Sequence, residues 1–400
     1  MMKRKIFLSK PGLICCAGRN ADELYESCLK GNREGFSFKN GYPVGLVSES
    51  ILPQLKAIDF NRRSRDGAEV STEKTKIFRI IDAALDQIRP EIEKAIAEYG
   101  REKIGVCLGS CDNGSESSLA AHKEFFEKGS FPKDYNLRFQ SASFPAEYIA
   151  EKFGLTGPVF TFATACASSA SAIAKGAELI RGGLCSAVIA GGADLVSGIV
   201  FTGFNTLGAV SDELCNPFSK NRKGINLGEG AAFFLLDFAE TPGGIELLGT
   251  GESTDAFHMT APGEDGAGPA RAMKAALLNA GLKPEQIGYT NLHGTGTALN
   301  DKAESLAMTA VFNPLPPSSS TKPITGHTLG AAGALEAAVC WMIINKGKGL
   351  PVHCWDGVHD DEFPPLPLDV RESTPSICMS NSYAFGGCNV SLILGKIAHD

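Results

Sequence analysis

The stretch that most constrains the fold is residues 157–183, in which a strand runs directly into a helix. Residues 159–163 are β-branched and aromatic, a composition typical of a buried strand. Residues 167–180 are small and mostly good helix formers, and the glycines at 182–183 predict the end of that helix. Cys166 is therefore predicted to lie at a sharp strand-to-helix turn, in the first turn of the helix.

Cys166 has the surroundings of a nucleophile. Free backbone N–H groups and the positive end of a helix both favour a thiolate at this position. The small neighbours Ala165, Ala167, Ser168 and Ser169 leave room for a substrate carbonyl to reach the sulfur. The alternative is a packed structural cysteine, because free cysteine is among the most buried residue types.

Composition indicates a cytoplasmic α/β enzyme. The 400 residues, 43% of them hydrophobic, can bury a large core as one domain or as two packed halves. The net charge of -7 argues against general nucleic-acid binding, although a local basic patch is compatible with it. No apolar run approaches the roughly 18 residues of a membrane-spanning helix, so no membrane insertion is expected.

The N-terminus and the cysteines support this interpretation. The apolar run at 6–8 is interrupted by Lys10 and Pro11 before it reaches the length of a signal peptide, so we predict a first strand at 5–9. The 12 cysteines form no Cys-x-x-Cys pair, and the histidine spacing fits no zinc site. We therefore expect no metal, and reduced thiols in a cytoplasmic protein.

The predicted elements alternate strands with helices, which indicates mixed sheets covered on both faces. A helix is predicted at 76–97 from its apolar periodicity. The glycine-containing strand segment at 223–236 is mirrored by 377–394, so the order of parts repeats. We predict two halves, 1–241 with the cysteine nucleophile and 242–400 with the remaining catalytic groups.

Five residues, each at a strand end or a turn and bracketed by small residues, form a candidate catalytic set: Cys166, His293, Lys322, His327 and Phe385. A thiolate nucleophile needs charge stabilisation and an oxyanion hole. Histidines in glycine-rich turns can supply proton transfer or N–H donors. A single histidine is more often structural or solvent-facing. Two histidines in glycine-rich turns, together with a cysteine at a strand-to-helix turn, are hard to explain by packing alone.

Four segments in this order resemble the β-ketoacyl-acyl-carrier-protein synthases: 164–169 (TACASS), 293–297 (HGTGT), 322–327 (KPITGH) and 384–387 (AFGG). The similarity runs from about residue 100 to the C-terminus and is closest to the elongating Cys-His-His branch of type II fatty-acid and polyketide synthesis. It implies a thiolase-like, five-layered αβαβα fold built from two pseudo-symmetric halves.

The resemblance also implies a mechanism. Cys166 would accept an acyl group from the phosphopantetheine of an acyl carrier protein. His293 and His327 would promote decarboxylation of malonyl carrier protein and stabilise the enolate, whose condensation with the acyl-enzyme gives a β-ketoacyl product. Lys322 would orient the site, paired with Glu336, because an unpaired buried ammonium is costly.

Further residues receive supporting roles by the same resemblance. The backbone N–H groups of the nucleophile and of Phe385 would form the oxyanion hole. Gly386 and Gly387 would let Phe385 swing as a gate over the acyl pocket, and Thr295 and Thr297 would bind the phosphopantetheine arm. No cofactor is implied, and whether a structural monovalent cation lies near the site is left open by the sequence.

Alternatives within the superfamily fit less well. The initiating, coenzyme A-using branch has asparagine where this chain has His327. Thiolases use a second catalytic cysteine, and Cys388 lies near that place, but Lys322 and His327 argue against a thiolase. A catalytically weak partner subunit of the chain-length-factor type usually lacks the nucleophile, which this chain has.

Two segments depart from the family pattern. Residues 216–219 (NPFS) and 222–224 (RKG) replace Arg-Pro-Phe-Asp and Arg-Asp-Gly, so the gating role of that turn is open. Asp112 stands where the family has glycine or aliphatic residues near the end of the acyl tunnel, and a carboxylate beside an alkyl tail is unfavourable. We hypothesise that Asp112 contacts a polar-ended, conjugated or aryl-capped chain, as in aryl polyene synthesis. The alternatives are a helix cap at the dimer interface and a housekeeping fatty-acid elongation enzyme.

The resemblance implies a homodimer, or a heterodimer with a chain-length-factor-like subunit, with the strand at 157–163 near the contact. Acyl carrier proteins are acidic, so a basic docking patch is expected, and Arg62, Arg63 and Arg65 are the candidates. The alternative for these arginines is an ordinary solvated surface cluster.

Overall fold

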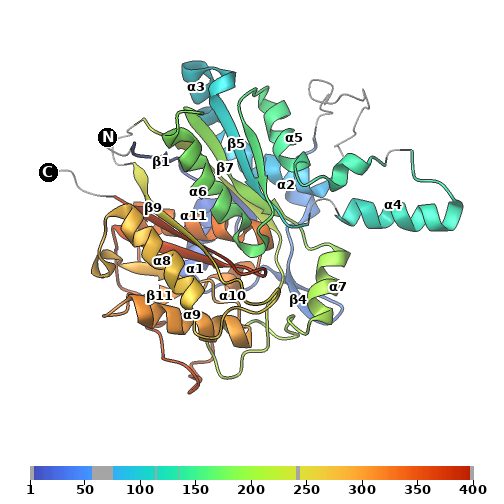
Figure 1. Ribbon diagram of the computed structural model, residues 1–400. Helices are drawn as coiled ribbons and strands as arrows, with labels where there is room; N and C mark the ends of the chain where they lie inside the picture. Colours follow the sequence, from blue (N-terminus) through green and yellow to red (C-terminus); the bar gives the residue numbers. More distant parts are fainter. Residues whose placement is uncertain (1–3, 56–74, 113–114, 134, 240–243, 397–400) are drawn as a thin grey trace.

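The computed structural model describes residues 4–55, 75–112, 115–133, 135–239 and 244–396. Two half-sheets meet at the short strand β1 (Phe7–Leu8), which pairs with β8 (Gly230–Asp237) on one side and β9 (Ile245–Thr254) on the other. The chain is thereby arranged as a thiolase-like stack of helices and strands around a continuous sheet (Figure 1).

The two half-sheets repeat one pattern. The first has the order β2-β8-β7-β5-β6, adding β2 (Gly12–Cys15), β5 (Ile104–Gly109), β6 (Val159–Phe162) and β7 (Ala187–Asp194). The second has the order β9-β13-β12-β10-β11, adding β10 (Tyr289–Asn291), β11 (Ser318–Ser319), β12 (Ile377–Tyr383) and β13 (Cys388–Gly395). In each, three parallel strands are followed by an antiparallel one. The boundary predicted at residue 241 lies in 240–243, outside the described residues.

Eleven α-helices of the described chain surround and separate these strands: α1 (Ala21–Lys30), α2 (Lys76–Leu85), α3 (Arg89–Tyr99), α4 (Ser115–Lys128), α5 (Phe144–Phe153), α6 (Ser168–Arg181), α7 (Gly198–Thr206), α8 (Ala267–Ala280), α9 (Ala298–Val311), α10 (Lys322–Thr325) and α11 (Ala332–Lys346). A separate hairpin is formed by β3 (Phe36–Lys39) and β4 (Tyr42–Gly45). Short 3₁₀ turns complete the described elements: η1 (Glu49–Ile51), η3 (Asp86–Ile88), η4 (Arg101–Lys103), η5 (Leu137–Gln140), η6 (Ala165–Ala167), η7 (Pro284–Gln286) and η8 (Leu329–Ala331).

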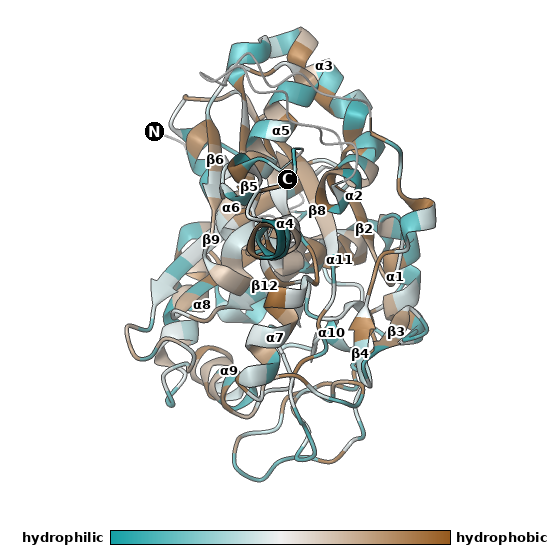
Figure 2. Ribbon diagram, turned by 90° about the vertical axis from the view of Figure 1, so that its right-hand side faces the viewer, coloured by the Kyte–Doolittle hydropathy of each residue, from teal (hydrophilic) through white to brown (hydrophobic). Residues whose placement is uncertain are grey.

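The middle layer consists of α6 and α11, which pack against each other and each contact strands of both halves. Helices α2, α3 and α5 cover the first half-sheet on its outer side, and α8 and α9 cover the second (Figure 1). Outer helices such as α3 alternate hydrophilic and hydrophobic colour, whereas β8 is hydrophobic nearly throughout (Figure 2). The predicted αβαβα layering is therefore confirmed.

The central helix α11 is largely apolar and nearly all of its residues are buried, as expected for a helix enclosed by protein. The segment Leu329–Lys346 is long and apolar enough to cross a membrane, but 89% of it is buried inside the protein, so it is a core helix. No disulfide joins the 12 cysteines, all of which lie in the described residues.

The continuous helix predicted at 76–97 is wrong in one respect. The structure divides it into α2 and α3 around η3. Ile88 leaves the helical region, with φ of -116° and ψ of 14°, and Pro90 starts the next helix. Proline has no N–H to continue the preceding helix and its ring clashes with the carbonyl four residues earlier, whereas it fits the first turn of a new helix, which explains the break.

Candidate active site

Cys166 lies in the short turn η6, which connects β6 to α6. Ala165 has a φ of +47°, a left-handed conformation that alanine seldom adopts. The Ser168 hydroxyl closes the turn, because its Oγ accepts from the Thr164 N–H at 3.0 Å and donates to the Ala165 carbonyl at 2.6 Å. The predicted strand-to-helix turn is present, and α6 begins just after the cysteine.

The structure brings the predicted sulfur and imidazoles together. His327 Nε2 lies 3.0 Å from Cys166 Sγ, and the His293 and His327 rings are 5.5 Å apart between centroids. One ligand atom from each of the three residues lies within 4.8 Å of the others, and all three residues are buried. His293 follows β10 and His327 follows α10, so both come from the second half. Thiol and imidazole are also ligands that zinc accepts, and they lie close enough to share an ion.

The two histidines are neutral. Burial lowers the pKa of His293 well below its usual value, and the nearby Lys322 ammonium and His327 lower it further. Burial and Lys322 likewise lower the pKa of His327. Lys322 Nζ lies 3.2 Å from His293 Nδ1 and can only donate, so the proton of that neutral ring lies on Nε2. An N–H donor therefore faces away from the lysine.

The Cys166 sulfur differs from the thiolate expected from its turn. Burial raises the pKa of Cys166 to about 12, while the Lys322 ammonium and a hydrogen bond from the Phe385 backbone act in the opposite direction. The resting group is therefore a thiol. Burial outweighs the effect of the helix end, and the sequence around the turn gives no measure of that burial.

Lys322 and Glu336 form the predicted buried ion pair. Nζ of Lys322 donates to a Glu336 carboxylate oxygen and, at 2.5 Å, to the carbonyl of His293. Burial raises the pKa of Glu336 to about 7, against the effect of the ammonium. The ion pair thus joins the start of α10, the central helix α11 and the His293 turn.

Two buried carboxylates that the sequence interpretation missed hold the 293–297 turn. Glu304 accepts from the N–H groups of His293 at 2.8 Å and Gly294 at 2.7 Å. Asp301 accepts from Gly296 at 3.2 Å and from Phe218 at 2.8 Å. Both lie on α9, spaced so that they share one helix face, directly after the HGTGT segment. The i, i+3 spacing of these two acidic residues just after the HGTGT segment is the sequence feature that indicates their role.

A third missed carboxylate, Asp194 at the end of β7, ties together the turns beneath the nucleophile. It accepts from the N–H groups of Cys111 at 2.9 Å, Asp112 at 2.8 Å and Gly330 at 2.6 Å. Burial raises the pKa of Asp194 to about 7, against these hydrogen bonds. Its partners come from two segments that are distant from it along the chain, so no local pattern indicates them.

Cys166, His293 and His327 line a cavity of about 450 Å³. Thr295, Thr297 and Phe385 line the same cavity. The Phe385 ring stacks on Phe204 of α7, with centroids 5.7 Å apart. Gly386 and Gly387, with φ of +84° and +76°, shape the segment after Phe385. The Gly386 N–H donates to the carbonyl of Met259 at 2.7 Å, which links the segment to the 255–262 loop at the cavity mouth.

Asp112 lies outside the residues that line this cavity. It is buried just before α4, where its carboxylate accepts from Ser115 Oγ and, at 2.5 Å, from Ser197 Oγ. This placement suits the helix-cap alternative. The contact of Asp112 with substrate stays a prediction. Arg62, Arg63 and Arg65 fall in 56–74, outside the described residues.

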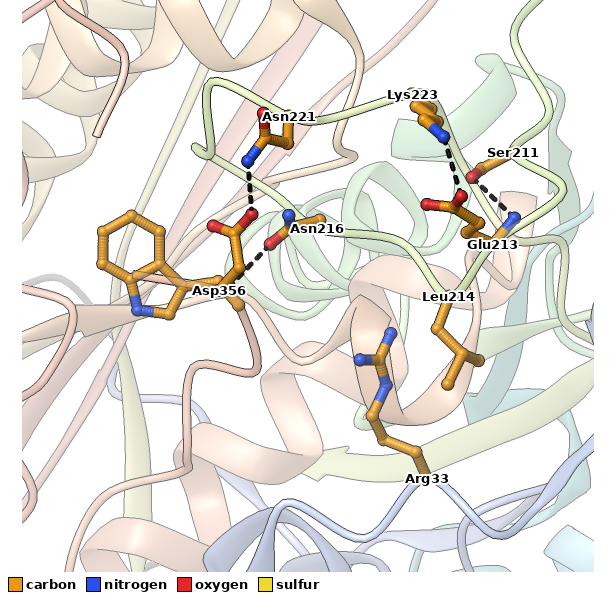
Figure 3. Close-up of a pocket in the computed structure, with 9 residues that line it drawn as sticks. Arg33, Ser211, Glu213, Leu214, Asn216, Asn221, Lys223 and Asp356 are labelled. Carbon is orange, nitrogen blue, oxygen red and sulfur yellow. Dashed lines mark hydrogen bonds and ion pairs between the residues drawn. The ribbon is translucent and has the colours of Figure 1, made fainter. Parts of the chain in front are cut away.

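The unusual 216–224 turn is fastened to a second segment, 356–362, which we name the acidic strap. The Asp356 carboxylate accepts from Ser219 Oγ at 2.8 Å. It also accepts from Asn221 Nδ2 at 2.8 Å, and the Asp356 N–H donates to Asn216 (Figure 3). Arg222 and Asp360 form a buried ion pair across the same contact. The turn and the strap border a polar cavity of about 570 Å³, into which Arg33 points (Figure 3).

Comparison with family models identifies two adjoining matches. Residues 81–241 match the model described as β-ketoacyl synthase, N-terminal domain, and residues 245–353 match the corresponding C-terminal domain. Nodulation protein E of Rhizobium meliloti is 31% identical over 99% of this chain and 100% of its own length. The 3-oxoacyl-acyl-carrier-protein synthase 2 of Staphylococcus aureus strain COL is 31% identical over 98% of both chains.

Solved structures agree with these matches. A ketosynthase, ApeO, in complex with its chain length factor ApeC from Xenorhabdus doucetiae, superposes with a TM-score of 0.89 at 38% identity over 98% of both chains. The ishigamide ketosynthase/chain length factor superposes with a TM-score of 0.85 at 27% identity, covering 99% of this chain and 100% of the other.

Proposed function

The chain belongs to the β-ketoacyl synthase family, and from that premise we propose how its residues divide the reaction. It is a β-ketoacyl-acyl-carrier-protein synthase, an acyltransferase that forms a carbon–carbon bond by decarboxylative condensation. The observation that carries the assignment of roles is the meeting of one thiol and two neutral imidazoles within 4.8 Å in a buried cavity.

In the first half-reaction, Cys166 Sγ attacks the thioester carbonyl of an acyl carrier protein. The new sulfur–carbon bond forms as the bond to the phosphopantetheine sulfur breaks, and that leaving sulfur takes up the proton that the Cys166 thiol gives up. His327 Nε2, 3.0 Å from Sγ, is close enough to relay this proton. The N–H groups of Cys166 and Phe385 hold the oxyanion of the tetrahedral intermediate.

In the second half-reaction, the malonyl unit loses carbon dioxide, and the electrons of the broken carbon–carbon bond pass to the thioester as an enolate. The neutral rings of His293 and His327 donate N–H bonds to the enolate oxygen. The enolate carbon then attacks the acyl-enzyme carbonyl, and the sulfur of Cys166 leaves as the β-ketoacyl product forms. That sulfur takes up a proton from solvent, which restores the resting thiol. Lys322 orients His293 through Nδ1 and is a positioning residue.

The test separates the two half-reactions. Cys166→Ala is expected to abolish both the acyl-enzyme, measured by intact-protein mass spectrometry, and condensation, measured as β-ketoacyl carrier protein. His293→Ala is expected to keep the acyl-enzyme and to lower condensation by about a thousandfold. Condensation at wild-type rate in Cys166→Ala would contradict the assignment and favour the weak-partner alternative.

We further propose that the enzyme works as a dimer, with a second copy or a chain-length-factor-like subunit, and takes its substrates from an acyl carrier protein in the cytoplasm. β6 is an edge strand of the sheet, and its Phe160 is 48% exposed. Helix α4 stands away from the body and its Phe126 is 82% exposed (Figure 1). Such surfaces invite a protein partner. Native mass spectrometry of the enzyme, purified together with its native partner proteins, distinguishes a homodimer from a heterodimer with a chain-length-factor-like subunit.

The finer proposal is that the acyl chain is conjugated, polar-ended or aryl-capped. It is supported by Asp112, whose neighbour Cys111 has its thiol 3.9 Å from Ser168 Oγ, close to the nucleophile. A buried carboxylate near a saturated tail would be unfavourable. Competition between polyenoyl or hydroxyaryl carriers and saturated C8–C14 carriers tests this. Equal or better use of saturated chains would contradict it and favour housekeeping fatty-acid elongation.

A further inference from the structure

The polar cavity beside the 216–224 turn takes no part in the reaction described above. Its volume of about 570 Å³ is within the usual range for small-molecule sites. Its lining comes from three stretches of the chain, at residue 33, between residues 211 and 223, and at 355–356. Of these lining residues, only Lys223 also borders the catalytic cavity. The two cavities are therefore distinct.

Arg33 supplies an unoccupied cationic group to this cavity. Its guanidinium points into the cavity (Figure 3), and it forms no ion pair with any residue that the structure describes. Its Nε donates to the carbonyl of Pro323 at 3.0 Å, and its Nη2 donates to the carbonyl of Cys215 at 2.9 Å. These two bonds use two of the five N–H donors of a guanidinium and fix its plane. A fixed, planar fork of donors matches the two oxygens of a carboxylate.

The other charged side chains at the cavity already have partners. Lys223 pairs with Glu213 at 2.7 Å. Burial acts to raise the pKa of Asp356, but hydrogen bonds from Asn221 and Ser219 help to lower it to about 2. The guanidinium is therefore the charged group that is left for a ligand, and its sign favours an anion.

Trp355 and Leu214 add apolar surface to the lining. The indole Nε1 of Trp355 donates to Asp369 at 3.3 Å. The ring also packs edge-on against His353 and His359, with centroids 5.7 and 4.9 Å away. An aromatic ring that is held in place near a guanidinium favours a ligand with a flat apolar body beside its charged group.

We propose that this cavity is a binding site for a small planar organic carboxylate. The two carboxylate oxygens accept from Arg33, and the flat body lies against the ring of Trp355. The charge of the ligand is set by the first residue and its shape by the second. None of the residues to which we assign the catalytic chemistry lines the cavity, so this site goes beyond the proposed function and does not depend on it.

The chain has two tryptophans, which permits a direct test of binding. In protein labelled with 5-fluorotryptophan, ¹⁹F NMR gives one resonance for Trp355 and one for Trp341, which is buried in α11 and serves as an internal reference. Trp355→Phe assigns the two resonances. Benzoate is expected to shift the Trp355 resonance with a dissociation constant of about 1 mM and to leave the Trp341 resonance in place.

Arg33→Gln tests the contact with the carboxylate. Benzoate binding, read from the Trp355 resonance, is expected to weaken at least about tenfold. Arg33→Lys keeps the charge but loses the planar fork, so an intermediate loss of about threefold is expected. The matched control is Arg19→Gln, an exposed arginine just before α1, which should bind benzoate like the wild type. An unchanged Trp341 resonance shows that each variant is folded.

A ligand series tests charge and shape in the wild type, without any substitution. Benzamide has the ring without the charge, and inorganic phosphate has the charge without the ring, so each is expected to bind about tenfold more weakly than benzoate. Cyclohexanecarboxylate, whose ring is not planar, is expected to bind about threefold more weakly.

Three results would each overturn the proposal. The first is a Trp355 resonance that benzoate leaves unchanged up to about 20 mM. The second is undiminished benzoate binding in Arg33→Gln. The third is binding of benzamide, phosphate or cyclohexanecarboxylate that is as tight as that of benzoate. All three are read at Trp355 and not at Cys166, so they leave the proposed function standing.

Discussion

The turns η6 and η8 share a backbone form but differ in chemistry. Each precedes a central helix, and each begins with a residue of positive φ, +47° at Ala165 and +51° at Leu329. The next residue is Cys166 in one turn and Gly330 in the other. A Cβ atom at Gly330 would lie 2.6 Å from Asp194 Oδ2, so the second turn has no room for a nucleophile.

This difference shows that the two halves of the molecule contribute different groups to the active site. The repeated strand order places the two turns in contact with each other. The first half contributes the sulfur on a turn of small residues, whereas the second contributes the imidazoles and the ammonium of Lys322. The shared backbone sets position, and the unshared side chains set chemistry.

Lys322→Met tests the contribution of the second half to the chemistry, and it is expected to have the largest effect. Condensation should fall about a hundredfold, because His293 loses its orienting donor. Removal of the ammonium also raises the pKa of His293 toward its usual value, so the acid limb of the condensation rate should move to higher pH. Lys346→Met, at the exposed end of α11, is the control and should leave the pH profile in place. An unshifted profile would contradict the positioning role.

Gly330→Ala tests the lack of room in the second turn. The new Cβ would meet Asp194 Oδ2 at 2.6 Å and Ser110 Cα at 2.9 Å. We expect a loss of about 1–3 kcal/mol in the free energy of unfolding, measured by urea titration. Gly203→Ala is the control, since its Cβ meets nothing within 4 Å, and in α7 it should be neutral or slightly stabilising. Equal stability of the two variants would contradict the crowding.

Acid should destabilise the second half first. His293, His327 and His353 lie there, and burial lowers the pKa of each, to about 4 for His353. Below about pH 6.5 these histidines bind protons in the unfolded chain but stay neutral in the folded chain. The free energy of unfolding therefore falls as pH falls through that value. Each histidine contributes about 1.4 kcal/mol per pH unit between about 6.5 and its folded pKa. His353→Gln should reduce this slope in urea titrations at pH 5–7, and an unchanged slope would contradict the assignment.

The smallest effect is expected from Ala165→Gly. Glycine relieves the positive φ but loses more entropy on folding, so unfolding free energy should rise by no more than about 1 kcal/mol. Leu329→Gly has the same backbone benefit but removes a buried side chain, so it should lose about 2–4 kcal/mol. Thermal denaturation of both variants measures the contrast. A loss in Ala165→Gly as large as in Leu329→Gly would mean that φ is not the source of strain.

Local patterns were sufficient to predict the alternation of strands and helices, the Cys166 turn and the residues that meet there, whereas the five-layered fold was implied only by the family resemblance. They missed Asp194, Glu304 and the acidic strap, because these act on backbone groups or side chains that are distant along the chain. They also gave the wrong protonation state for the Cys166 sulfur, since desolvation depends on the complete packing around the site. The break between α2 and α3 is indicated in the sequence by Pro90, because proline fits the first turn of a helix but not its interior.

The two-residue strand β1 has a consequence for motion. It pairs with β8 of one half-sheet and with β9 of the other. A hinge opening between the two halves would therefore break the backbone hydrogen bonds of β1. Admission of a long acyl chain must therefore be achieved by small rearrangements at the rim, in the 255–262 and 384–387 segments, while the scaffold stays rigid.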